Sequence, residues 1–386
     1  MVAGAGGPLG HRVCRRLVDH PRVGTVVGLD LRADPGIAGV DYVSGDITEI
    51  DLDTRLGEVD VLVHLVSALE PWPDGAPDGA SDGEVTRTRR VRPPAGAARA
   101  PDGASDGEVT RTLLEAAGSA GVGRLVLMST AMVYGAWPDN PVPLTEASPL
   151  RPVPGFSFAV NKAEQERFAA RWAEDHPAVD IVTLRPTTSL AEDHVGWVAR
   201  SLRSATNLTR EGEVPVQFLH LDDLAAAVEL AVVGDLSGVY NVAPEGWISS
   251  GTTLDLEGLT PRVRLPEQLL GRLSMWWWRH RPNVGGAAVE SPTLLGRLSG
   301  RHSLVPTCPS VFQYARFPWV VGSDRLRAAG WTPQYTSDLA YISGHKGHRW
   351  GMLDSRRRQQ LALGVAVAGV LGLLWGFLAV ARRLLR

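Results

Sequence analysis

The sequence predicts an α/β protein with a doubly wound parallel sheet, a smaller second lobe and one C-terminal transmembrane helix. Short β-branched runs alternate with amphipathic stretches over residues 1–190, which is typical of a parallel sheet with helices on both faces. Hydrophobic residues make up 44% of the 386 positions, which excludes a disordered chain. Residues 361–381 contain no charged side chain, which predicts the membrane helix.

The first 190 residues are expected to form one domain in which strands and helices alternate. We expect strands at 25–30, 59–65, 124–128 and 180–184, and helices at 12–20, 110–120 and 159–175. Residues 191–340 are expected to form the smaller lobe. The two parts interleave, because about residues 216–245 have the pattern of elements that return to the first domain.

One segment interrupts the alternation. Residues 77–88 and 101–112 have the same sequence, PDGASDGEVTRT, and the residues between them are basic and rich in Pro and Ala. Two copies without apolar positions cannot stack into a core. The pattern therefore predicts a duplicated, disordered insertion over residues 74–106, of which only the second copy leads into a helix. A basic loop that contacts lipid is the alternative.

The C-terminal apolar run has the length of a membrane span. Its 21 residues extend about 31 Å as a helix, the thickness of the hydrocarbon core of a bilayer. A buried core helix is the alternative. Basic residues flank both ends, so charge does not fix the orientation. Residues 341–360 would be a basic juxtamembrane linker, and the absence of a signal-peptide pattern places the main domain in the cytoplasm.

Composition excludes several classes of function. A net charge of −3 gives no general basic footprint for nucleic acid. Cys14 and Cys308 form no C-x-x-C pattern, which excludes a disulfide scaffold or a thiolate zinc site. His345 and His348 lack a carboxylate or Cys at ligand spacing, so no metal site is expected.

A glycine-rich turn provides the first chemical signal. Gly4, Gly7 and Gly10 precede an amphipathic helix, and this spacing lets a pyrophosphate approach the N-terminus of the helix. Asp30 ends the next strand, where a carboxylate holds both ribose hydroxyls and repels a 2′-phosphate. NAD is therefore preferred, while Arg32 keeps NADP open; a solvated strand-end acid is the alternative role of Asp30. Since only three residues precede Gly4, we expect a stunted first strand or, as we favour, a true start a few codons upstream.

Several further segments, in order, resemble one family. They are SGDIT, VDVLVHLVSA, LVLMSTAMVYG, LRPT, VQFLHLDDLAAAVELA and GSDRLRAAGWTP. Over about residues 1–340 the chain resembles the extended short-chain dehydrogenase/reductases, and within them the NAD-dependent epimerase/dehydratase group of actinobacterial type. The resemblance implies a Rossmann-type fold that binds NAD, and it is compatible with a homodimer.

The resemblance also assigns roles to individual residues. Asp46 and Ile47 would contact adenine, and Thr130 would take the catalytic Ser/Thr role. Lys162 would bind the nicotinamide ribose and tune the catalytic base. The full set of implied cofactor contacts is Gly4, Gly7, Leu9, Gly10, Asp30, Arg32, Asp46, Ile47, Leu65, Val66, Ser67, Lys162, Arg185 and Pro186.

The chain departs from the family at its acid/base. The family has a Tyr four residues before the Lys, but Phe158 stands there, and none of the six tyrosines precedes a lysine at that spacing. Loss of a general base typically lowers the rate by ~10²–10⁴. Asp106 also stands where the family has an Asn. His194 could supply the missing base, with a plain surface histidine as the alternative.

Two functions follow as expectations. The first is a membrane-tethered, epimerase/dehydratase-like oxidoreductase that acts on a nucleotide-sugar or a lipid-linked substrate of the cell envelope. The second is a catalytically silent NAD-binding sensor or scaffold at the membrane. A lipid-surface protein without a cofactor is a third interpretation, which saturable NADH binding would exclude.

Overall fold

The computed structural model describes residues 1–67, 106–208, 214–249 and 310–344, and the isolated positions 252, 253, 256 and 360. The predicted membrane helix at 361–381 lies outside this part of the chain, and so does nearly all of the insertion at 74–106. No helix among the described residues is long and apolar enough to cross a membrane.

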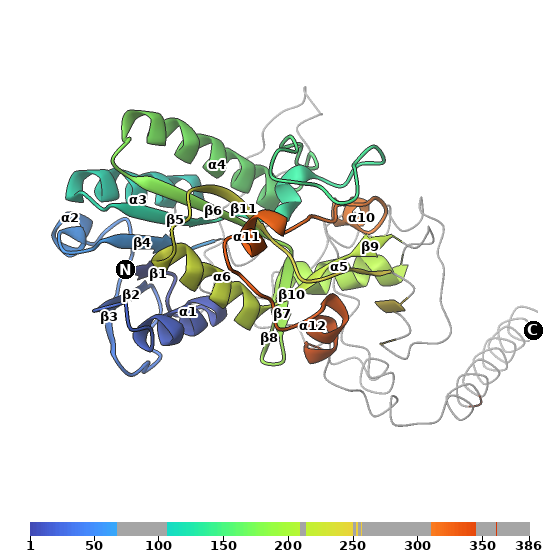
Figure 1. Cartoon of the computed structure of the whole chain (residues 1–386), viewed down its shortest axis with the longest axis horizontal. Helices are drawn as coiled ribbons and strands as arrows, with labels where there is room; N and C mark the ends of the chain where they lie inside the picture. Colours follow the sequence, from blue (N-terminus) through green and yellow to red (C-terminus); the bar gives the residue numbers. More distant parts are fainter. Residues whose placement is uncertain are drawn as a thin grey trace, which may run out of the picture.

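A seven-stranded sheet forms the centre of the fold (Figure 1). Its strand order is β11-β6-β5-β4-β1-β2-β3, and every neighbouring pair is parallel. The strands are β1 (Val2–Ala3), β2 (Val26–Asp30), β3 (Val40–Ser44), β4 (Val61–His64), β5 (Arg124–Met128), β6 (Asp180–Pro186) and β11 (Gly238–Val242). The sheet confirms the predicted Rossmann-type α/β class.

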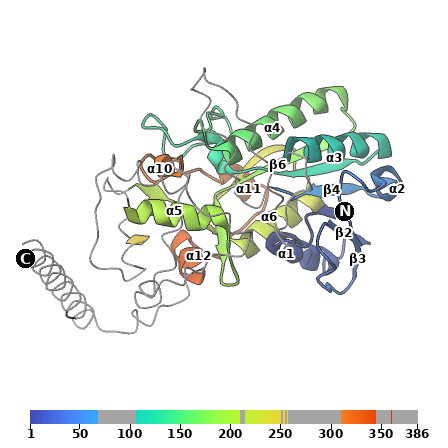
Figure 2. The same cartoon turned by 180° about the vertical axis from the view of Figure 1, so that it is seen from behind.

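Helices cover both faces of this sheet (Figures 1 and 2). One face carries α1 (Pro8–Val18) and α6 (Leu221–Val233). The other carries α2 (Leu52–Leu56), α3 (Asp106–Ala120) and α4 (Ser157–Asp175).

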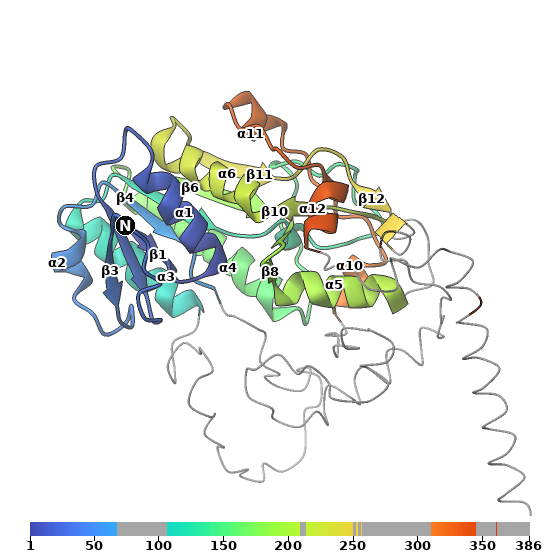
Figure 3. The same ribbon diagram turned by 90° about the horizontal axis from the view of Figure 1, so that it is seen from below.

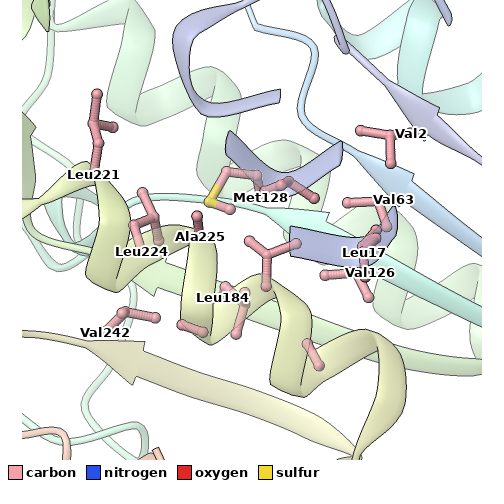
Figure 4. Packing of buried hydrophobic residues seen from close by; sticks show 14 of the residues in the cluster. Val2, Leu17, Val63, Val126, Met128, Leu184, Leu221, Leu224, Ala225 and Val242 are labelled. Atoms are coloured by element: carbon pink, nitrogen blue, oxygen red, sulfur yellow. The ribbon is translucent and has the colours of Figure 1, made fainter. Parts of the chain in front are cut away.

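The strand sequences explain this burial, because successive side chains point to opposite faces. In β5, Val126 packs in the core under α1 and α6, while Leu125 and Leu127 pack in the core under α3. Figure 4 shows Leu184 against α6 and Val126 beside Leu17 of α1.

The second lobe follows β6 in the chain. It contains a three-stranded sheet of β7 (Thr188–Ala191), β8 (His194–Val195) and β10 (Phe218–His220), and a two-stranded sheet of β9 (Pro215–Val216) and β12 (Ile248–Ser249). Around them lie the helices α5 (Trp197–Leu208), α10 (Val311–Tyr314) and α12 (Ser337–Ser343), whereas α11 (Asp324–Ala328) packs against β11 of the larger sheet. Figure 3 shows α5, α10 and α12 at the end of the molecule away from β3.

The chain returns to the first domain between parts of the second lobe. Residues 221–242 supply α6 and β11, and β11 pairs with β6 at the edge of the seven-stranded sheet. The carboxyl end of β6 leads into β7 of the second lobe, and the carboxyl ends of the strands are the usual position for a ligand in an open α/β sheet.

Candidate functional site

The glycine-rich turn between β1 and α1 permits close backbone approach. The Gly4 N–H donates to the Leu29 carbonyl at 2.8 Å, and Gly4 has a φ of +94°, which favours glycine. A Cβ on Gly10 would lie 2.1 Å from the Gly4 carbonyl oxygen, so position 10 has room only for glycine. The first N–H groups of α1 have no partner within the helix, and with the helix dipole they favour an anion at this turn.

Asp30 and Arg32 lie on either side of Gly6 in this turn. Asp30 accepts hydrogen bonds from the Gly6 and Arg32 backbone N–H groups, each at 3.0 Å, and the Arg32 guanidinium donates to the Gly6 carbonyl at 3.0 Å. Each Asp30 oxygen keeps acceptor capacity for a ribose hydroxyl. The structure therefore brings the predicted carboxylate to the glycine turn and places a cation there as well.

Tyr42 belongs to the same corner and was not found from the sequence. Its hydroxyl donates to the Arg32 carbonyl at 3.1 Å and lies 2.8 Å from where a Cβ on Gly6 would stand. Burial, then the charge of Asp30, raises the pKa of Tyr42 to about 12. The phenol is thus neutral and supports the turn from the third strand of the sheet.

Two unpaired polar atoms fit a bound adenosine group. Asp46 Oδ1 accepts from the Thr48 backbone and hydroxyl, while Asp46 Oδ2 is buried with no hydrogen-bond partner within the described ranges. The Ser67 hydroxyl is in the same condition. The exocyclic amine of adenine is a donor that Asp46 Oδ2 could accept, and Ile47 beside it is buried. The backbone at Leu65 and Val66 packs within 3.2 Å of the Cβ position of Gly4, so the end of β4 meets the glycine turn.

Thr130 and Lys162 both lie at the carboxyl end of β5. Lys162 on α4 is 2% exposed, and its Nζ donates to the Met128 carbonyl at 3.1 Å. Thr130 lies two residues after Met128, is buried, and accepts from the Met132 N–H at 3.3 Å as the cap of a 3₁₀ turn, η1 (Ala131–Tyr134). The ammonium and the hydroxyl therefore both lie at the carboxyl end of β5, and their predicted catalytic and cofactor-binding roles stay predictions.

Phe158 lies one helical turn before Lys162 and packs into an aromatic cluster. Its ring centroid is 5.9 Å from that of Phe156 and 5.3 Å from that of Trp197, which it meets edge to face. Such pairs stabilise beyond their buried area. The side chain at this position therefore bridges α4 and α5 and offers no group for proton transfer.

Arg185 is held in a buried ion pair with Glu166. Its Nη2 lies 2.5 Å from Glu166 Oε2, its Nη1 donates to the Tyr134 hydroxyl at 2.7 Å, and Tyr134 donates to Asn241 at 2.8 Å. Ser129 also hydrogen-bonds Glu166. These contacts tie β5, β6 and β11 to α4, while the predicted contact of Arg185 and Pro186 with the cofactor stays a prediction.

His64, at the end of β4, is a second residue that sequence reasoning missed. It is 1% exposed, and its Nε2 lies 2.9 Å from the Thr110 hydroxyl on α3. Burial, then the charge of Lys162, lowers the pKa of His64 to about 3, so the imidazole is neutral. Its position in the segment VDVLVHLVSA was the available signal.

His194 lies on β8, beside the glycine turn. Burial, then the charge of Arg200, lowers the pKa of His194; Arg12 and Arg32 lower it further, while Asp193 raises it. Lys162 is not among the charges that affect it, so its role as a replacement base stays a prediction. Among the described residues no group of three His, Cys, Asp or Glu side chains could hold a metal ion.

Known proteins resemble this chain in both sequence and fold. A reductase from Streptomyces, 3-diazoavenalumate denitrifying reductase, is 30% identical over 315 residues, which cover 77% of this chain and 94% of the reductase. A dTDP-glucose 4,6-dehydratase from Streptomyces niveus is 28% identical over 257 residues, 64% of this chain and 65% of that enzyme.

A solved structure shows the same fold. It is a Tyr-to-Phe mutant of UDP-glucuronic acid 4-epimerase from Bacillus cereus, in complex with NAD and UDP-4-deoxy-4-fluoro-glucuronic acid. The TM-score is 0.57 and the identity 17%, over 89% of this chain and 96% of the epimerase. The profile of one family matches residues 97–243, a range that includes Thr130, Phe158 and Lys162. On these matches and the site geometry, the chain belongs to the NAD-dependent epimerase/dehydratase family.

Proposed function

We propose that the chain is a membrane-tethered, NAD-dependent oxidoreductase of the epimerase/dehydratase type whose acid–base step is weakened. The observation that carries this is the glycine turn, with Asp30 against its backbone and the unpaired Asp46 Oδ2 at the next strand end. The carboxylate of Asp30 favours NAD over NADP, because it would repel a 2′-phosphate.

The residues of the site divide the work between binding and proton handling. Bound NAD supplies the hydride acceptor. The buried ammonium of Lys162 would bind the ribose hydroxyls on the nicotinamide side, and the Thr130 hydroxyl would hydrogen-bond and orient the reacting hydroxyl of the substrate. Phe158 can neither accept nor donate a proton, so substrate deprotonation would rely on a slower route such as solvent.

A nucleotide-sugar is the substrate class that the relatives support. Their names include a dTDP-glucose dehydratase and a UDP-glucuronic acid epimerase. The apolar run at 361–381 supports a tether, which would also give access to a lipid-linked substrate of the cell envelope. We propose that the main domain lies in the cytoplasm.

Phe158 favours a second candidate, a catalytically silent NAD-binding sensor or scaffold at the membrane. Its ring is committed to the cluster with Phe156 and Trp197. The Bacillus cereus epimerase carries a Tyr-to-Phe change and still holds NAD and a nucleotide-sugar analogue. In that protein, the loss of this phenol is therefore compatible with binding of both molecules.

Phe158→Tyr distinguishes the two functions. If the pocket is intact, the new phenol beside Lys162 should raise turnover of UDP- or dTDP-hexoses by roughly 10²–10⁴, as restoring a general base does. Turnover is measured by product formation and by isotope exchange at the nicotinamide. Phe168→Tyr, which adds a phenol elsewhere on α4, is the control and should change nothing. Equal absence of turnover in the wild type and in Phe158→Tyr, with NADH still bound, would favour the silent module.

A further inference from the structure

Arg12 joins three parts of the fold that are distant in sequence. Its Nε donates to Asp222 Oδ1 at 2.7 Å and its Nη2 to Asp193 Oδ1 at 2.6 Å. Its Nη1 donates to the carbonyl of Pro8, the first residue of α1, at 3.1 Å. Asp222 lies in the first turn of α6, and Asp193 lies between β7 and β8. The guanidinium is therefore fixed at the N-terminal end of α1, next to the glycine turn.

The segment that Arg12 reaches is a tight antiparallel hairpin. β7 and β8 pair through Leu190 with Val195 and Ala191 with His194, which leaves only Glu192 and Asp193 in the turn. In Figures 1 and 2 this hairpin lies between α1 and α12. Both turn residues are exposed carboxylates, so side chains from other elements must hold the turn in place.

A second contact holds the other turn residue. The imidazole of His220, which is fully buried, lies 3.2 Å from Glu192 through its Nε2 and stacks on the Tyr335 ring at 3.8 Å between centroids. His220 Nδ1 accepts from the Asp222 N–H, so Nε2 carries the donor toward Glu192. The hairpin turn is thus anchored on one side to the second lobe and on the other, through Arg12, to α1.

The hairpin stands beside the part of the fold that would hold the cofactor phosphates. Arg12 donates both to Asp193 in the hairpin turn and to the carbonyl of Pro8, the residue that follows Gly7 of the glycine turn. An anion on the N-terminal end of α1 would therefore have the hairpin as its neighbour.

We propose that Arg12 is a positioning residue that holds the β7–β8 hairpin beside the glycine turn and so slows release of the dinucleotide. This inference rests on the NAD binding proposed above. Arg12 acts through the hairpin, because two carboxylates and a carbonyl already accept its hydrogen bonds. The side chain of Asp193 is 61% exposed, so we expect salt to weaken this contact.

Arg16 provides a matched control on the same helix. It lies one turn after Arg12 and also joins α1 to α6, through Glu229 at 2.7 Å, but within the described ranges it makes no hydrogen bond or ion pair with the hairpin. Arg16→Gln removes a bridge between the same two helices and leaves the hairpin contacts in place. Asp193→Asn weakens the hairpin contact instead and keeps the bond between Arg12 and Asp222, which joins the two helices.

The experiment measures NADH dissociation from the full-length protein by stopped-flow fluorescence, with excess NAD as the competitor. We expect Arg12→Gln and Asp193→Asn each to release NADH about two- to fivefold faster, because each change removes the ion pair between Arg12 and the exposed Asp193 carboxylate. The double variant should be no faster than Arg12→Gln alone, since both changes break one contact. Arg16→Gln should keep the wild-type rate.

The dependence of the NADH release rate on salt distinguishes this role of Arg12 from a purely structural one. The wild-type release rate should rise with sodium chloride toward that of Asp193→Asn, whose own rate should change little. Thermal melting checks that each variant is folded. If folded Arg12→Gln and Asp193→Asn release NADH at the wild-type rate, or if Arg16→Gln is accelerated equally, the inference about Arg12 is wrong, while the proposed function is unaffected. A wild-type protein without saturable NADH binding would overturn the proposed function as well.

Discussion

At the residue scale, His64 predicts how stability depends on pH. Its folded pKa of about 3 lies below the ordinary pKa of 6.5 of an exposed imidazole. Between these values the unfolded chain binds the extra proton and the folded chain does not, so stability falls as the pH drops below about 6.5. Above that pH, His64 causes no loss of stability, because the imidazole is then neutral in both the folded and the unfolded state.

Urea unfolding at a series of pH values tests this expectation. The loss of unfolding free energy between about pH 7 and pH 5 should be larger in the wild type than in His64→Asn, which has no imidazole to protonate. If the variant is too unstable, the ring resonances of His64 in the wild-type protein should show no titration above about pH 5. An ordinary titration near 6.5, or equal pH dependence of both proteins, would contradict a buried neutral imidazole.

At the scale of elements, the pair of Glu166 and Arg185 links α4 to β6 inside the fold. Both side chains are 6% exposed. Glu166→Gln leaves the Arg185 charge buried without its counter-charge, so we expect a loss of about 3–5 kcal/mol of unfolding free energy. Asp139→Asn, which weakens the exposed pair with Arg151, should cost far less, because solvent screens that pair.

Paired apolar replacement provides the control for this prediction. Glu166→Met together with Arg185→Met removes both buried charges, and much of the lost unfolding free energy should return. Urea unfolding measures all three variants. A Glu166→Gln variant as stable as the wild type would show that the pair does not hold these elements together.

The elements also show what sequence could and could not predict. The strands at 26–30, 124–128 and 180–186 were expected, because their apolar runs are buried on both faces of the sheet. The sheet-edge strand at 40–44 was missed, since none of its residues is fully buried and its apolar pattern is weak. The expected helix at 110–120 begins instead at Asp106, because Val109 already packs in the core.

The same contrast holds within the site. The glycine turn and its partner Asp30 could be predicted, because a close backbone approach demands glycine at fixed spacing. The contacts of Glu166 with Arg185 and of His64 with Thr110 could not, because their partners lie 19 and 46 residues apart and meet only after the sheet has formed. The sequence alone indicated that Phe158 stands at the position of the family's acid/base Tyr. Only the structure shows that its ring packs against Phe156 and Trp197.

At the scale of the whole molecule, the tether is a prediction about residues 361–381. Deletion of this run should release the protein from the membrane fraction, because a single apolar helix of this length is a sufficient anchor. Sedimentation of lysates after an alkaline wash measures it, with NADH binding as evidence that the truncated protein is folded. A folded, truncated protein that still sediments with membranes would contradict a tether at this position.

The most direct test of the account is a titration of the full-length protein with NADH and NADPH, followed by fluorescence and calorimetry. We predict saturable binding that is tighter for NADH than for NADPH, because of Asp30 at the glycine turn. Binding should weaken strongly in Gly10→Ala, whose Cβ would meet the Gly4 carbonyl at 2.1 Å. A folded wild-type protein that gives no saturable signal with either nucleotide would contradict the account.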